Sequence, residues 1–137
     1  MRIDIEYLKE LLGIILDHDK PDFNIGLDKI NPLWNDDDKL NKLVFHLEIL
    51  NDQGLIKSTN GSSSLGFRRA SDGSVMVGVI PLRLTADGHQ FASDLSKPGV
   101  LEKLKTSFQD SGPTETVKLV FALGKKAIDR KLAELSE

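Results

Sequence analysis

The sequence predicts a helix-dominated α+β fold for this chain of 137 residues. Three observations support this prediction. Apolar residues recur every three to four positions at both ends of the chain, a run over 75–85 is rich in β-branched residues, and glycine and serine gather between two short apolar stretches. The length suits one main core, because most single domains have roughly 100–150 residues.

Composition excludes several classes of protein. Hydrophobic residues make up 39% and charged residues 28% of the chain, which provides a core and is too much charge for a membrane protein. No run approaches the ~18 apolar residues of a membrane span, and the first residues lack the order of a signal peptide, so we expect a cytoplasmic protein. Cysteine is absent, which excludes disulfides and thiolate metal sites.

The first part of the chain predicts a helix followed by irregular structure. Residues 3–17 have the period of an amphipathic helix, which ends at a turn-forming cluster that contains Pro21. Residues 23–30 alternate apolar with polar residues or glycine and predict either a short strand or a degenerate helix. Asn31 and Pro32 then break this pattern.

A second helix is predicted over 36–53. Its start carries acidic residues at 36–38, which suit the positive end of a helix dipole, and Gly54 suits its C-cap. Phe45 and Ile49 point away from its buried face, so they either lie beneath the C-terminal helix or form an exposed apolar strip. The buried face is a leucine-rich ridge formed by Leu40, Leu43, Val44, Leu47 and Leu50.

Residues 55–85 predict a long hairpin. Residues 55–58 read as a short strand, 59–64 as a flexible tip of turn-forming residues, and 75–85 as the best strand of the chain. Arg68 and Arg69 form the densest basic pair, inside a tip that we place at about 58–74. Pro81 indicates an edge position or a bulge.

Three helices are predicted after the hairpin. Thr85 is the expected N-cap of a helix that runs to Leu95, a second helix covers about 100–108, and Thr114 or Thr116 caps a last helix that reaches about 135. The last helix either folds back over the core or pairs with its counterpart in a dimer. Its apolar stripe consists of Val117, Val120, Phe121, Gly124, Ile128, Leu132 and Leu135.

This order of elements is typical of a winged helix-turn-helix with a C-terminal helical extension. The helix at 36–53 would be the recognition helix and 58–74 the wing. We expect a winged-helix domain over 1–97 and the extension over 98–137.

Two segments of the chain resemble a bacterial and prophage-borne family that is known only as domain of unknown function 2513. Residues 45–56, FHLEILNDQGLI, are similar to the family's YHLxLLxxAGLI, and residues 80–91, IPLRLTADGHQF, are similar to its PxRLTWEGHEFL. The resemblance implies a winged-helix fold and a setting in bacteria or mobile elements. It brings no established activity and no catalytic residues.

The charge is uneven along the chain. Residues 1–54 hold six Lys and Arg against twelve Asp and Glu, a balance of −6, whereas 55–90 have +2 and 91–137 have +1. Because cations supply most of the affinity for nucleic acid, the middle segment is the best candidate for DNA contact. The candidate residues are Lys57, Arg68 and Arg69, assisted by Lys39, Lys42 and His46 on the predicted recognition helix.

Two functions therefore stay open at this point. The first is a non-enzymatic, DNA-binding transcriptional regulator of a prophage. The second is a protein-interaction module, because the acids at 36–38 repel phosphate and the outward apolar residues suit a protein contact. Its candidate interface, with a protein partner or a second copy, consists of Phe45, Ile49, Phe121 and Ile128.

No sequence motif indicates an enzyme. The chain has no nucleophile elbow, no phosphate-binding glycine loop and no recognised metal-ligand spacing. We therefore expect no catalytic residue, no metal and no cofactor.

Overall fold

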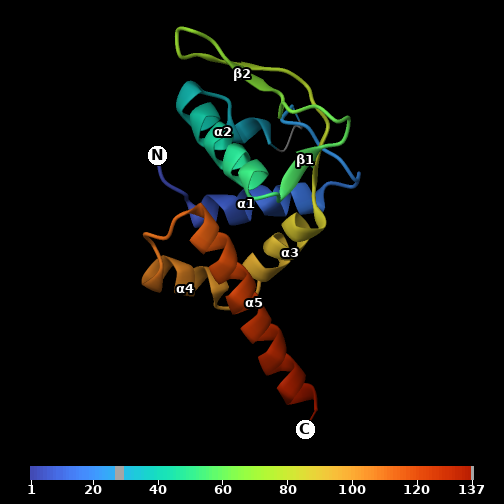
Figure 1. The fold of residues 1–137 in the computed structure, drawn as a ribbon, viewed down its shortest axis with the longest axis vertical. Helices are drawn as coiled ribbons and strands as arrows, with labels where there is room; N and C mark the ends of the chain where they lie inside the picture. Colours follow the sequence, from blue (N-terminus) through green and yellow to red (C-terminus); the bar gives the residue numbers. More distant parts are fainter. Residues whose placement is uncertain (27–29, 137) are drawn as a thin grey trace.

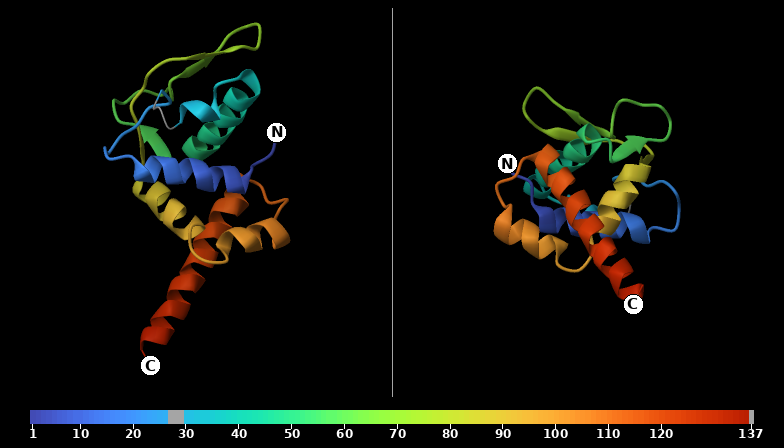
Figure 2. Two further views of the ribbon diagram at one scale, coloured as in Figure 1. Left: turned by 180° about the vertical axis from the view of Figure 1, so that it is seen from behind. Right: turned by 60° about the horizontal axis from the view of Figure 1, so that its bottom comes forward.

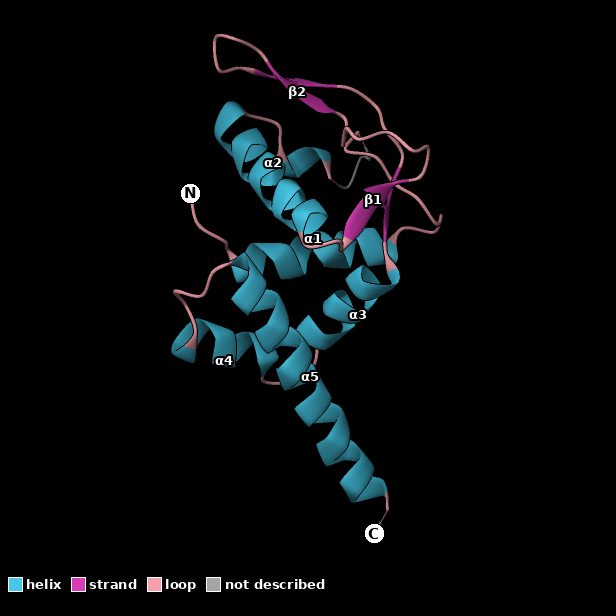
Figure 3. Ribbon diagram, in the orientation of Figure 1, coloured by secondary structure: helices cyan, strands magenta, loops and turns pink. Residues whose placement is uncertain are grey.

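The structure, a computed structural model, describes residues 1–26 and 30–136 and is a helix-dominated α+β fold. These residues form five α-helices and two small antiparallel sheets. The sheets lie at the α2 end of the molecule, and α4 and α5 lie at the other end (Figures 1 and 3). The helices are α1 (Ile5–Asp17), α2 (Asp37–Asp52), α3 (Ala86–Leu95), α4 (Val100–Ser107) and α5 (Pro113–Leu135), with a short 3₁₀ turn, η1 (Asn31–Leu33). The strands are β1 (Ile56–Ser58), β2 (Phe67–Arg69), β3 (Val75–Val77) and β4 (Leu82–Leu84).

The predicted helices 3–17 and 36–53 are confirmed, and aspartates begin both. The Asp4 carboxylate accepts a hydrogen bond of 3.0 Å from the Tyr7 N–H, and the Asp36 carboxylate accepts one of 2.8 Å from the Lys39 N–H. Each bond satisfies an amide that has no partner inside its own helix. The predicted leucine-rich ridge of α2 is buried in full.

The predicted long hairpin over 55–85 is confirmed in its course, but it is divided into two nested strand pairs. β1 pairs with β4, with Ile56 opposite Leu84, whereas β2 pairs with β3, with Phe67 opposite Val77. The predicted strand 75–85 is broken at 78–81, where Pro81 has no N–H to donate to a ladder. Its carbonyl still accepts from the Thr59 N–H at 2.9 Å and extends the β1–β4 pairing by one residue. The outcome is a flap, defined here as residues 59–81, that stands on the β1–β4 pair.

The strand predicted over 23–30 is reduced to one residue. Phe23 forms a bridge with Leu82, in which its N–H donates to the Leu82 carbonyl at 2.8 Å and its carbonyl accepts from the Leu82 N–H at 2.7 Å. Residues 25 and 26 already turn, and 27–29 lie outside the described residues. β4 therefore lies between Phe23 on one side and β1 on the other.

Helix α3 is fixed to the turn between α2 and β1 by a close approach that only glycine permits. Thr85 caps α3 as predicted, since its hydroxyl accepts from the Gly88 N–H at 3.0 Å and donates to the Gly54 carbonyl at 2.6 Å. A Cβ atom on Gly88 would overlap the backbone carbonyl of Leu55. Gly88 is therefore required by packing and not by a turn.

Helix α5 packs on the core with its first half only. It begins at Pro113, one turn before Thr116, because proline is well suited to the first helical position; Thr114 and Thr116 are not its caps. Val120 is buried in the same apolar cluster that holds α1, α2 and α3. The second half, which carries Ile128 and Leu132 as exposed residues, extends away from the body (Figures 1 and 2). The first half therefore folds back over the core, and pairing of this helix in a dimer stays a prediction.

We expect Gly88→Ala to lower the free energy of unfolding by at least roughly 2 kcal/mol, because the added methyl group meets a backbone atom that cannot move aside. Urea denaturation followed by circular dichroism measures this change. Gly13→Ala in α1 is the matched control, since nothing lies within 4 Å of its Cβ position, and alanine there should stabilise by roughly 0.5–1 kcal/mol. Equal effects of the two substitutions would contradict this packing.

Candidate functional site

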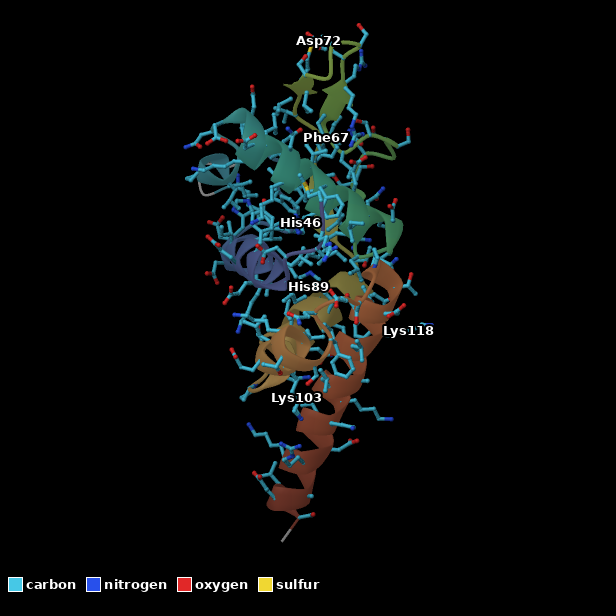
Figure 4. The ribbon with its side chains drawn as sticks, turned by 90° about the vertical axis from the view of Figure 1, so that its left-hand side faces the viewer. His46, Phe67, Asp72, His89, Lys103 and Lys118 are labelled. Carbon is cyan, nitrogen blue, oxygen red and sulfur yellow. The ribbon has the colours of Figure 1, made fainter. Side chains whose placement is uncertain are left out.

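His46, predicted to face DNA, is instead fully buried between α2 and α1 (Figure 4). Its Nε2 accepts a hydrogen bond of 2.9 Å from the Asp4 backbone N–H, and its Nδ1 lies 2.7 Å from the Lys42 carbonyl. Because an amide only donates and a carbonyl only accepts, the imidazole is neutral with its proton on Nδ1. The sequence prediction is wrong here because α1 covers α2 beyond the leucine-rich ridge.

Lys42 is also turned towards α1. Its Nζ lies 2.8 Å from the Asp4 carboxylate and 4.7 Å from the centre of the Tyr7 ring. Burial opposes the charge of Asp4, but hydrogen bonds from Lys42 and from the Tyr7 N–H outweigh it, so the pKa of Asp4 lies below its ordinary value. Lys42 therefore stabilises the start of α1, and it would have to give up this ion pair to contact DNA.

The two arginines of the flap have different surroundings. Arg69 forms a two-pronged ion pair with Glu48 on α2, in which one Nη1–Oε2 distance is 3.1 Å. Arg68 points to the other face of β2 and is exposed. Lys39 lies beside Asn35 and Asp36 at the acidic start of α2. Of these three predicted DNA contacts, Arg68 alone has no carboxylate within 4 Å among the described residues.

Arg83 is a cation that sequence reasoning missed. It lies directly opposite Lys57 in the β1–β4 register, on the face away from the buried Ile56 and Leu84. Neither cation forms an ion pair with a residue that the structure describes. The alternation Leu82-Arg83-Leu84 is the signal that could have revealed this pair, but it requires the correct strand register.

Phe45 and Ile49 lie in the wall of a groove. Both are half-buried and stand outside the main apolar cluster. The N-terminal segment (residues 1–4) and the loop before α5 form the other walls of this hollow of about 680 Å³. We call it the α2 groove. Its lining residues are Met1, Arg2, Ile3, Phe45, Ile49, Gln109, Asp110, Ser111, Gly112 and Pro113.

The predicted partner interface is not one surface. Phe121 is half-buried and packs edge-on against Phe91 of α3, at 6.1 Å between ring centres, so it contacts the core. Ile128 lies on the extending half of α5 and is 42% exposed. Phe45 and Ile49 are therefore the two predicted interface residues that share a site. Their cover is the N-terminal segment, the loop at 109–112 and Pro113, the first residue of helix α5.

Comparison with protein-family models, curated proteins and solved structures finds no match to this chain. Within residues 1–26 and 30–136, no helix has the length and apolar character that crossing a membrane requires. The same residues contain no group of three or more His, Asp or Glu side chains arranged to hold a metal ion. The resemblance drawn from residues 45–56 and 80–91 stays a prediction.

The Tyr7 hydroxyl, beside His46, should lose its proton at a higher pH than an exposed tyrosine does. Burial, with the charges of Glu10 and Asp4, raises the pKa of Tyr7 to about 12. Tyr7 is the single tyrosine of the chain, so tyrosinate absorbance reports it directly. Because its folded pKa exceeds the ordinary value of 10.0, stability is full below pH 10 and falls as the pH rises from there towards 12.

Tyr7→Phe should remove this alkaline loss of stability. The Tyr7 hydroxyl is buried with no hydrogen-bond partner among the described residues, so the variant should equal the parent or exceed it by roughly 1 kcal/mol at neutral pH. Urea unfolding on both sides of pH 10 compares the two proteins. A tyrosinate transition at the ordinary value would show that the ring is not enclosed.

Proposed function

We propose that the described helices and strands form a winged helix-turn-helix, with the flap as its wing and α2 in the place of the recognition helix. The order of elements supports this: α1, a bridged residue at Phe23, η1, α2, β1, the flap and β4. The position of β4 between Phe23 and β1 supports it too, because a small sheet of that order backs the helices of a winged helix. The resemblance to the prophage-borne family forms part of this proposal.

We infer that the chain is a non-enzymatic protein-interaction module on this frame. The observation that carries this inference is the α2 groove, where Phe45 and Ile49 remain half-buried beside Ile3 and Pro113. These two apolar side chains are not part of the core, and the hollow is large enough for several side chains of a partner. Both features favour a protein or a peptide as that partner.

The electrostatics of α2 argue against its use as a DNA-reading helix. Its start exposes Asp37 and Asp38, which repel phosphates. Lys42 and Arg69, the cations that would offset them, are paired with Asp4 and Glu48. A helix that enters the major groove needs its first turns free of such charge.

The α2 groove should select peptides with two or more apolar residues. We expect a displayed random-peptide library to give binders whose affinity falls at least about tenfold, or 1.4 kcal/mol, with Phe45→Asp. Ile128→Asp is the matched control, because it places the same charge on an exposed apolar site of α5. Failure to obtain any peptide that distinguishes the parent from Phe45→Asp would refute the interaction module.

DNA contact is the second candidate function, and the pair Lys57–Arg83 favours it. Like charges directly opposite each other destabilise a strand pair, and an anion would relieve this repulsion. Arg68 on the flap adds a further cation without an ion pair among the described residues. This surface would contact the phosphate backbone and would not read base edges.

Anisotropy titration with random-sequence duplex DNA separates the two candidates. If DNA is bound, Lys57→Ala and Arg83→Ala should each reduce the slope of log affinity against log salt by about 0.9, because each loses one phosphate contact. Lys131→Ala, on the extending half of α5, should leave the slope unchanged. Absence of binding at low salt would remove the DNA candidate and leave the interaction module in place.

A further inference from the structure

We propose that His46 is a proton-sensitive latch that holds the N-terminal segment against α2 and so fixes one wall of the α2 groove. The latch is the hydrogen bond of 2.9 Å from the Asp4 backbone N–H to Nε2. Met1, Arg2 and Ile3 directly precede this bond and line the groove. The proposal concerns the groove of the proposed function, but the latch exists whether or not a partner binds.

The geometry makes this bond dependent on a neutral imidazole. Nε2 must present its lone pair to Asp4, and Nδ1 must donate to the Lys42 carbonyl. If Nε2 gained a proton, two N–H donors would face each other, one on Nε2 and one on the Asp4 amide. The hydrogen bond between them would then be lost. The ring has little room to turn away, because Tyr7 and Phe45 pack against it with ring centres 4.6 Å and 5.1 Å apart.

The charged and titratable groups around His46 come from α1, its cap and α2. Asp4 and Tyr7 face it from the α1 side, Glu10 lies behind Tyr7, and Lys42 faces it from its own helix. Burial is the dominant effect and lowers the pKa of His46 below its ordinary value of 6.5, although Asp4 acts in the opposite direction. At neutral pH the closed latch is therefore the unprotonated form.

The sign of the pH dependence follows from this. A released segment exposes His46 to water, where it takes up a proton near pH 6.5, whereas the closed latch does not. Acidification below pH 6.5 therefore favours release. One pH unit below the pKa of the released imidazole, at about pH 5.5, the equilibrium shifts roughly tenfold towards release. This window lies above pH 3.8, the ordinary pKa of Asp4, so carboxylate protonation is not involved.

Release would change the α2 groove on one side only. Phe45, Ile49 and Pro113 belong to α2 and to the start of α5 and keep their places, while the wall formed by residues 1–3 becomes free to move. The apolar side chains of Phe45 and Ile49 would then gain exposure. The groove is thus narrower at neutral pH and more open in mild acid.

Amide hydrogen exchange of the full chain tests the latch. Between about pH 7.5 and 5.5, and after correction for intrinsic exchange, the protection of the Asp4 amide should fall about tenfold. The protection of the Leu11 amide, in the buried middle of α1, should fall less. Equal loss at both amides would mean global unfolding, and no loss at Asp4 would mean that the bond does not respond to protons; either result overturns the proposal.

Two variants identify the group that titrates. The chain has three histidines, so the double variant His18→Gln/His89→Gln leaves His46 as its single histidine and should keep the full pH response of Asp4. The side-chain oxygen of glutamine in His46→Gln can accept from the Asp4 amide, and glutamine does not titrate in this range. In this variant the protection of the Asp4 amide should therefore not change with pH. Loss of the response in the double variant would overturn the proposal even if His46→Gln does not fold.

Discussion

The α1–α2 junction depends on one neutral imidazole that satisfies two backbone groups at once. His46 accepts from the Asp4 amide and donates to the Lys42 carbonyl, in a place that no solvent reaches. Asp4 is the N-cap residue of α1, so this bond joins the start of α1 to α2. The Asp4 carboxylate also forms an ion pair with Lys42. Asp4 thereby holds the preceding residues 1–3 beside α2, where they line the groove. Loss of either bond would leave a buried polar group without a partner, at a cost of roughly 1–3 kcal/mol.

The ion pairs of this chain decide what its surface can bind. Lys42, Lys97, Arg69 and Lys105 each reach a carboxylate on the protein itself. The pairs of Lys42 and Arg69 neutralise the cations that lie at the α2 surface. The opposed pair Lys57–Arg83 differs, because the strand register brings two like charges together. Which cations an anion could reach therefore depends on this pairing more than on the net charge. The proposed contact at the α2 groove needs no cation.

Helix positions could be predicted from the sequence, because capping aspartates, a capping threonine and apolar periodicity are local signals. The leucine-rich ridge and the Thr85 cap are confirmed for this reason. Strand pairing could not be predicted in full, since residues 55–85 contain four short strands whose register depends on contacts distant in sequence. His46 was misplaced because its burial depends on Tyr7 and Asp4, about forty positions away. Gly88 lies inside the predicted helix, but its close contact with the Leu55 carbonyl is distant in sequence and has no local signal.

The state of the His46 ring tests this account most directly. Long-range proton–nitrogen correlation NMR at about pH 7.5 distinguishes a protonated ring nitrogen from one that only accepts. The account predicts a single tautomer for His46, with the proton on Nδ1 and a free lone pair on Nε2, while exposed His89 shows the averaged signals of a solvated imidazole. A proton on Nε2 of His46, or averaged signals like those of His89, would contradict the α1–α2 junction described above.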